Sequence, residues 1–394
     1  MKNLTFEGSG QEYFKIWIVN ILLIIVTLGL YYPWAKVRNH RYFYANSTLE
    51  DRSFNYHATG KQLFISYLIG TGLFIVYSIV ESFSAIGGLI LLEIFFLSFP
   101  WIVWRSLKFN LRATSFSNVR FSFEGALSGA YVNYFLLPIV VFLAVYSVPV
   151  LLVIAFGGEG AGSVGGLAVL GIVISLVLAF YLMALLNKKS TTYTLSSYRF
   201  GQGQFSTLLE TKEFAKILIK TIGLGVVVMV GFMMFMGVVV AGSIGLEGVV
   251  SIQEGLIDQE KMKDILSRGI LFMIVVPIYL GLFVASFIVY SYSTVRQREY
   301  IFKNSRLDDV ITFSSGLTVR AMAWIAISNL VLIVITFGLA MPWAKVRMTR
   351  YMLENTYVNS EADIDQYMTE KQEEQSSLGA QIGDAFDVDV GIGI

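Results

Sequence analysis

The 394-residue sequence contains no cysteine and only two histidines, His40 and His57. The absence of cysteine excludes disulfides, thiolate metal sites and cysteine nucleophiles. Two imidazoles are too few for the usual histidine-based metal cluster. No Ser-His-Asp set, phosphate-binding glycine loop or dinucleotide fingerprint is found in the sequence. We therefore expect no cofactor, no metal site and no enzymatic activity.

Charged residues are also scarce. They make up 14 % of the chain, against 55 % hydrophobic residues, whereas soluble domains average about a quarter charged and about half apolar. Apolar runs of 18 or more residues are long enough to cross a hydrocarbon core of about 30 Å. Such runs occupy residues 14–34, 62–79, 83–104, 131–156, 164–187, 215–243, 268–292 and 321–343. The sequence therefore predicts an all-α polytopic membrane protein with about eight transmembrane helices.

The basic residues are concentrated in alternate loops. Lys and Arg are abundant in residues 35–61, 105–130, 188–214 and 293–320, whereas the intervening connections are short or acidic. Because positive loops stay inside, we expect these four loops in the cytoplasm and no nucleic-acid partner. Eight crossings then predict that both termini are periplasmic, which leaves Lys345 and Arg347 outside. A terminal run that re-enters without crossing removes this conflict.

One unusual string occurs twice, as "TLGLYYPWAKVRNHRY" at 27–42 and "TFGLAMPWAKVRMTRY" at 336–351, with eleven of sixteen positions identical. This indicates degenerate internal repeats. We interpret the string as a helix exit with an interfacial anchor, in which tryptophan lies at the membrane interface and basic side chains reach anionic headgroups. The anchor residues are Pro33, Trp34, Lys36, Arg38, Pro342, Trp343, Lys345 and Arg347. The alternative is a substrate-binding break within a membrane helix, as in transporters.

Short alternating stretches follow the helices. Each basic loop contains one, namely "RSFNYHATG", "VRFSFEG", "SYRFGQG" and "VITFSSG", and the N-terminal "LTFEGSG" is similar. Alternation of apolar and polar residues beside turn residues predicts short strands. We expect them to form a small cytoplasmic β-cap, with unrelated amphipathic loops at headgroup level as the alternative. The expected organisation is a strand-like segment at 1–13, a repeat-built transmembrane domain at 14–356 and an acidic, disordered tail at 357–394.

The long string from "FEGSGQEYF" through "NYHATG", residues 6–60, and the "TFGLAMPWAKVRMTRY" echo carry a resemblance. The sequence resembles the bacterial inner-membrane YjgN-like family, of unknown function, over about residues 4–360. The resemblance implies a polytopic protein of the bacterial inner membrane. It supplies no reaction, ligand or catalytic residue.

Three polar residues within the apolar runs are candidate functional residues, because polar and ionisable groups in a membrane are costly. Glu93 lies midway along the third run and serves either a proton or cation relay or a structural hydrogen bond. Asn20 and Asn329 each precede a repeated proline by 13 residues. They are expected to face one another across a bundle, either in a functional role or as interhelical hydrogen bonds.

Two classes of function remain open. Repeats and Glu93 favour a transporter or channel. The scarcity of intramembrane charge and the aromatic-rich loops favour a non-catalytic membrane organiser or assembly partner. Both predict a multi-pass inner-membrane protein whose partners are the bilayer, anionic headgroups at the basic loops, and other proteins or a second copy of the chain.

Overall fold

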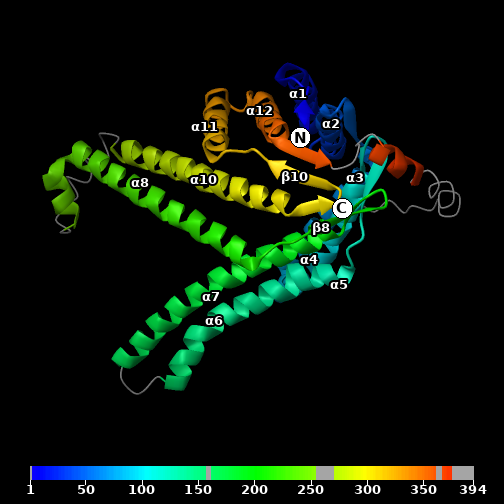
Figure 1. The fold of residues 1–394 in the computed structure, drawn as a ribbon. Coiled ribbons are helices and arrows are strands. Elements are labelled where there is room, and N and C mark those ends of the chain that lie inside the picture. Colours follow the sequence, from blue (N-terminus) through cyan, green and yellow to red (C-terminus); the bar gives the residue numbers. More distant parts are fainter. Residues whose placement is uncertain (1, 157–160, 254–269, 361–365, 375–394) are drawn as a thin grey trace. The chain divides into compact units, whose positions relative to one another are not determined.

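The structure is a computed structural model that describes residues 2–156, 161–253, 270–360 and 366–374. Figure 1 shows the fold, coloured along the chain. The chain divides into two compact units. One comprises Met1–Ala215, Arg298–Leu317 and Leu332–Ile394, and the other Lys216–Gln297 and Thr318–Val331. The helices are α1 (Gly10–Val26), α2 (Tyr32–Ala45), α3 (Gly60–Phe83), α4 (Ala85–Arg112), α5 (Leu127–Tyr131), the π-helical turn η1 (Val132–Leu136), α6 (Leu137–Phe156), α7 (Ala161–Ser196), α8 (Thr211–Gln253), α10 (Ile270–Lys303), α11 (Val319–Ile335) and α12 (Met341–Glu354).

All described strands belong to the first unit and pair in one antiparallel sheet. They are β1 (Lys2–Asn3), β2 (Thr5–Phe6), β3 (Ser47–Leu49), β4 (Arg52–Tyr56), β5 (Thr114–Phe116), β6 (Val119–Phe123), β7 (Tyr198–Phe200), β8 (Gly203–Thr207), β9 (Ser305–Leu307), β10 (Ile311–Ser315) and β11 (Thr356–Ser360). Their spatial order is β1-β11-β10-β9-β8-β7-β6-β5-β4-β3-β2. Because β1 and β2 are neighbours in the chain but lie at opposite ends of this order, the N-terminal segment joins the two edges. The sheet is therefore a nearly closed barrel.

Four β-hairpins build most of the barrel, one from each basic loop. The turn between β3 and β4 has positive φ at Glu50 (50°) and Asp51 (62°), and that between β5 and β6 at Ser117 (49°) and Asn118 (66°). Positive φ at both central residues is the geometry of a two-residue hairpin turn that matches strand twist. These turns pair a three-residue strand with each alternating stretch. The predicted small cap is instead a nearly closed barrel. The sequence did not reveal β3, β5 and β9, because a strand of three residues is too short to show an alternating pattern.

The barrel is filled with apolar side chains. Phe116, Val119, Phe200, Leu307 and Ile311 are all buried, with Val119 at 0 % and Phe200 at 2 % exposure. Aromatic contacts link successive strands, as between Phe121 and Phe200, whose ring centroids are 5.0 Å apart. The barrel interior is the principal hydrophobic core of the described chain, and it explains why the loops are rich in aromatic residues.

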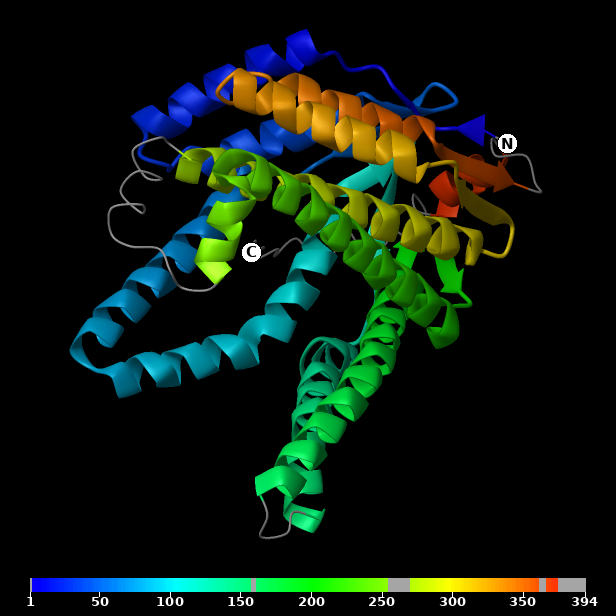
Figure 2. The same cartoon turned by 90° about the vertical axis from the view of Figure 1, so that its left-hand side faces the viewer.

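Six helices, rather than the expected eight, are long and apolar enough to cross a membrane among the described residues. They are Gly60–Phe83, Ala85–Arg112, Leu127–Phe156, Gly165–Ser196, Thr211–Val239 and Val276–Lys303. In chain order these helices form three pairs, and each pair connects two barrel strands that are hydrogen-bonded to each other. The helices α6 and α7 lie side by side (Figures 1 and 2). In each span at most 17 % of the most apolar window is buried. Such exposure suits helices that face lipid or other proteins.

The first and last apolar runs are not among these spans, because a turn interrupts each of them. The helix α1 has 17 residues and reverses at Leu28 (φ 50°) and Gly29 (φ 92°), and α11 ends in the same way at Phe337 (51°) and Gly338 (91°). A helix of 17 residues is about 25 Å long, short of a 30 Å core. Hydropathy alone does not register the turn, so the sequence count was two too high.

The sheet also settles the relative side of the termini. Strands β1, β2 and β11 pair with strands from the basic loops, and paired strands lie on one side of a membrane. The expectation of termini opposite the basic loops is therefore wrong, since it depended on eight crossings. Both copies of the repeated string now return toward the basic side, in agreement with the positive-inside rule.

The acidic C-terminal segment is structured further than its composition predicts. The expected boundary at residue 357 falls inside β11, which pairs with β10 over five residues. Residues 366–374 form a further helix, hereafter the C-terminal helix, in which Tyr367 and Met368 are buried against the barrel core. The rest of the predicted tail, 361–365 and 375–394, lies outside the described residues.

Candidate functional site

The repeated string places its tryptophan in the same environment twice. Trp34 on α2 packs 4.9 Å from Phe64 on α3, between ring centroids. A Cβ atom added to Gly60, four residues before Phe64, would lie 2.2 Å from Trp34 Cδ1. The prolines of both copies occupy the first turn of α2 and α12, where proline is preorganised for a helix start. Each copy therefore starts directly after a helix that ends at Val26 or Ile335, as in the predicted helix exit, and it also contains the start of the next helix.

The second copy repeats these contacts on α1. Trp343 packs 5.1 Å from Phe14, and a Cβ atom on Gly10 would lie 2.2 Å from its Cδ1. The exposed fractions of 37 % for Trp34 and 42 % for Trp343 show that part of each side chain stays exposed. Each tryptophan thus packs against the start of a neighbouring helix while part of its side chain remains exposed.

Gly60→Ala should lower the apparent Tm of the purified protein, because the added methyl group forces Trp34 out of its place at a cost of about 1–3 kcal/mol. Gly70→Ala is the matched control on the same helix, since a Cβ atom there meets nothing within 4 Å. Thermal unfolding in detergent measures both. Equal Tm values for the two variants would contradict the packing role of Trp34.

A pocket of about 440 Å³ lies beside the first copy of the string, within the first unit. Its walls come from α1, α2 and α12. The lining residues are Trp17, Asn20, Ile21, Ile24, Tyr32, Ala35, Lys36, Asn39, His40, Phe43 and Lys345. Two lysines line the pocket, and none of the described lining residues is acidic. The pocket is therefore electropositive.

Polar groups converge at this pocket. The Asn20 side-chain amide donates a 3.3 Å hydrogen bond to Asn39 Oδ1, while the buried Asn20 Oδ1 has no hydrogen-bond partner among the described residues. The Lys345 ammonium lies 4.6 Å from the Phe43 ring centroid and donates to the Tyr13 hydroxyl at 3.4 Å. A buried oxygen without a hydrogen-bond partner lowers the stability of the fold. Asn20 Oδ1 could therefore accept a hydrogen bond from a ligand in the pocket.

Burial and positive charge shift the titration of the pocket residues. Burial, together with the charges of Lys36 and Lys345, lowers the pKa of His40 below its usual value, so this imidazole is neutral near pH 7. Burial also lowers the pKa of Lys345. Outside the lining, burial raises the pKa of Tyr13, which accepts a hydrogen bond from Lys345, to about 12 and keeps the phenol protonated. The pocket thus offers neutral donors beside two cations, an arrangement suited to an anion.

The structure brings three of the sequence candidates together, namely Asn20, Lys36 and Lys345. The Asn20 side-chain amide donates to Asn39, and Asn329 is buried on α11. The other candidates lie elsewhere. Glu93 is exposed on α4, Arg38 donates to the Tyr31 hydroxyl at 3.4 Å, and Arg347 is exposed on α12.

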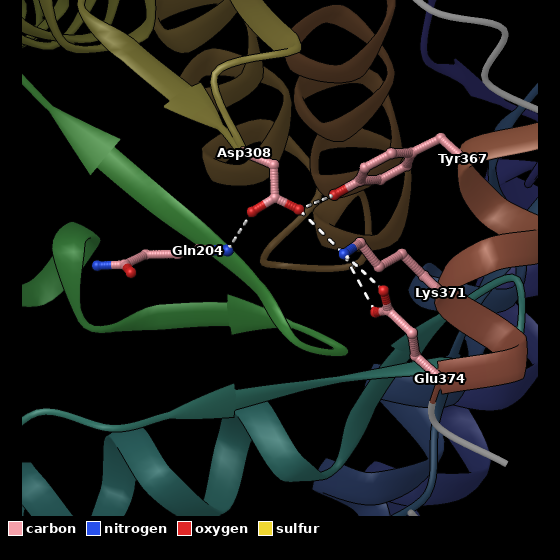
Figure 3. A network of polar contacts seen from close by, with 5 residues as sticks. All are labelled: Gln204, Asp308, Tyr367, Lys371 and Glu374. Carbon is pink, nitrogen blue, oxygen red and sulfur yellow. Dashed lines mark hydrogen bonds and ion pairs between the residues drawn. The ribbon is translucent and has the colours of Figure 1, made fainter. Parts of the chain in front are cut away.

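The C-terminal helix forms a second polar cluster, at the barrel end that carries the hairpin turns (Figure 3). Asp308, in the β9–β10 turn, accepts hydrogen bonds from Gln204 N at 2.7 Å and the Tyr367 hydroxyl at 2.9 Å, and pairs with Lys371 at 3.1 Å. Gln372 donates to the Ser117 carbonyl at 2.6 Å. This helix therefore caps the barrel.

Sequence reasoning missed Asn39 and His40 in the pocket and the pair of Asp308 and Lys371 at the cap. The sequence did contain a pattern for the pocket, because Lys36, Asn39 and His40 have the i, i+3, i+4 spacing of residues on one helix face. No such pattern linked Asp308 with Lys371. The two members of this pair are 63 positions apart, and only the barrel brings them together.

Comparisons with known proteins agree with the fold. The chain is 30 % identical to "Inner membrane protein YjgN" of Salmonella typhimurium (strain LT2) over 374 residues, covering 91 % of this chain and 89 % of the relative. It is 28 % identical to the protein of the same name from Escherichia coli O157:H7, covering 96 % and 93 % of the two chains. No solved structure matches. Residues 1–385 match the family described as "Bacterial protein of unknown function (DUF898)". With six apolar helices of spanning length and these relatives, the chain is a multi-pass inner-membrane protein and belongs to that family.

Proposed function

We propose that this protein is a non-catalytic organiser of the inner membrane, which holds other membrane proteins or further copies of itself. The observation that carries this proposal is the barrel, whose interior is filled by buried side chains and capped by the C-terminal helix. The filled interior leaves no solute path through the barrel itself, which suits a structural role for this part of the chain. The described spans, which are largely unburied, then supply surface for lipid and protein contacts. The basic side chains near the barrel are proposed to face anionic headgroups.

We also propose that the chain consists of five degenerate units, each made of a strand, a helical hairpin and a strand. The order of elements supports this proposal, since every described helical hairpin runs between neighbouring strands of the barrel. Further support comes from the equivalent contacts of Trp34 with Gly60 and of Trp343 with Gly10. Repeats of this kind build a closed barrel from one small unit.

A transporter or channel is the second candidate. The unpartnered Asn20 oxygen in the pocket and the carboxyl group of Glu93 on α4 favour it, since intramembrane polar groups mark transport paths. The two candidates differ in what Glu93 faces. An organiser places it against another helix or a partner chain, whereas a transporter exposes it to water.

Labelling of Glu93→Cys with a membrane-impermeant maleimide distinguishes these candidates, and the absence of native cysteine makes the assay specific. We expect little labelling in intact membranes and full labelling after denaturation, because an organiser keeps this position away from water. Lys61→Cys, at the exposed start of α3, is the control and should label wherever the basic side is accessible. Ready labelling of Glu93→Cys in membranes, accompanied by solute flux in liposomes, would favour the transporter.

A further inference from the structure

The pocket formed by α1, α2 and α12 is lined by both polar and apolar side chains. Helix α2 runs from the α1–α2 turn to β3, so His40 and Phe43 lie nearer the barrel than Tyr32 does. Ile21 and Ile24, late in α1, contribute apolar side chains to the lining. A pocket that has both charged and apolar lining residues is complementary to a molecule with a charged head and a hydrocarbon chain.

The charged end is built for an anion. Lys36 and Lys345 contribute two positive charges from different helices, and none of the described lining residues is acidic. Lysine is a common phosphate ligand in proteins. Asn39 has its oxygen engaged by Asn20, which leaves its amide hydrogens free to donate toward a ligand.

The buried Asn20 oxygen adds a second requirement. It accepts no hydrogen bond from any described residue although it is buried, and a lysine-bound phosphate oxygen has no hydrogen to give it. A hydroxyl group on the ligand's head would satisfy it. The pocket therefore matches a head that carries both a phosphate and a hydroxyl donor.

We propose that this pocket binds one phosphate-bearing amphiphile, with the phosphate held by Lys36 and Lys345 and the chain lying against Ile21 and Ile24. The inference goes beyond the organiser role, because it holds for an organiser or a transporter alike. The volume of about 440 Å³ accommodates a headgroup and the first part of a chain rather than a whole lipid. The remainder of the chain then lies in the surrounding membrane, as expected for helices at its interface.

The test uses the full-length protein in nanodiscs of phosphatidylcholine, titrated with phosphatidylglycerol and followed by native mass spectrometry after release. We expect one phosphatidylglycerol retained per chain. Replacing both lysines, as Lys36→Gln with Lys345→Gln, should weaken retention about tenfold or more. Lys61→Gln is the matched control, since it removes one exposed charge outside the pocket and should leave retention unchanged.

Two further arms distinguish the source of the phosphate. Inorganic phosphate at millimolar concentration should compete weakly, because it lacks the chain, and Ile21→Gln should weaken retention of the lipid without unfolding the protein. Circular dichroism checks the fold of each variant. Retention that is unchanged in the double lysine variant would overturn the proposal. Binding of inorganic phosphate as tight as that of the lipid would overturn the assignment to an amphiphile.

Discussion

Phe200→Ala should destabilise the barrel by about 3–5 kcal/mol, which is a large loss for a single truncation. Phe200 is 2 % exposed, and its ring centroid lies 5.0 Å from that of Phe121 on β6 and 6.4 Å from that of Phe116 on β5. Removing the ring leaves a cavity that rigid antiparallel strands cannot close, because their hydrogen bonds fix their spacing. Denaturant unfolding followed by tyrosine and tryptophan fluorescence measures the loss.

Leu208→Ala is the control for this experiment. Leu208 follows β8 directly but is 82 % exposed, so its truncation creates no cavity and should change stability by less than about 0.5 kcal/mol. A small effect of Phe200→Ala, similar to that of the control, would mean that the barrel is not a cooperative core.

Asp308→Asn should release the C-terminal helix from the barrel. The substitution keeps the shape of the side chain but removes the charge that pairs with Lys371, whose side chain is only 12 % exposed. Hydrogen bonds to charged groups typically contribute about 1.5–3 kcal/mol. A nine-residue helix fastened mainly by Tyr367, Met368 and this cluster has little else to hold it. Trypsin should then cleave after Lys371 much faster than in the unmodified protein, as mass spectrometry of the fragments would show.

Acid should also release the C-terminal helix, because it protonates Asp308. Burial alone would raise the pKa of Asp308, but hydrogen bonds from Gln204 N–H, Tyr367 and Lys371 outweigh it and hold the pKa below the usual 3.8. A depressed pKa means that the carboxylate stabilises the cap above pH 3.8 and loses this contribution as the pH falls through the lower, folded-state value. The cap should therefore persist at neutral pH.

Asp309→Asn provides the matched control for the cap. Asp309 is the next residue in the same turn, but its described contact is a 3.3 Å hydrogen bond from the Ser206 hydroxyl. Trypsin cleavage after Lys371 should stay slow in this variant. Equally slow cleavage in Asp308→Asn would show that apolar contacts alone hold the C-terminal helix.

Apolar run length was a reliable guide to the long helices and misleading at the two ends of the chain. Six runs correspond to helices of spanning length, because about 20 apolar residues suffice to cross the hydrocarbon core. The run at 14–34 has similar hydropathy but turns at Leu28 and Gly29. The turn depends on the positive φ angles of only two residues. Hydropathy averaged over a window of residues does not detect such a local change of backbone conformation.

The repeated string was recognisable from the sequence, but its contacts were not. Trp34 and Trp343 were expected to meet lipid, and each also packs against a glycine at the start of another helix. The partners of Trp34 follow it by 26 and 30 residues, whereas those of Trp343 precede it by more than 300. Only closure of the barrel makes these two situations equivalent.

The sequence by itself determined the environment of this protein. Its composition, long apolar runs and alternate basic loops specify a multi-pass membrane protein, because hydrophobic transfer and charge placement are additive properties of short segments. The tertiary structure alone decided the closed barrel, the electropositive pocket and the Asp308 cap. Each joins segments that are distant along the chain, such as Lys36 with Lys345 or Lys2–Asn3 with β11. Such pairings depend on how hairpins close around a common core, and no local pattern of residues encodes that closure.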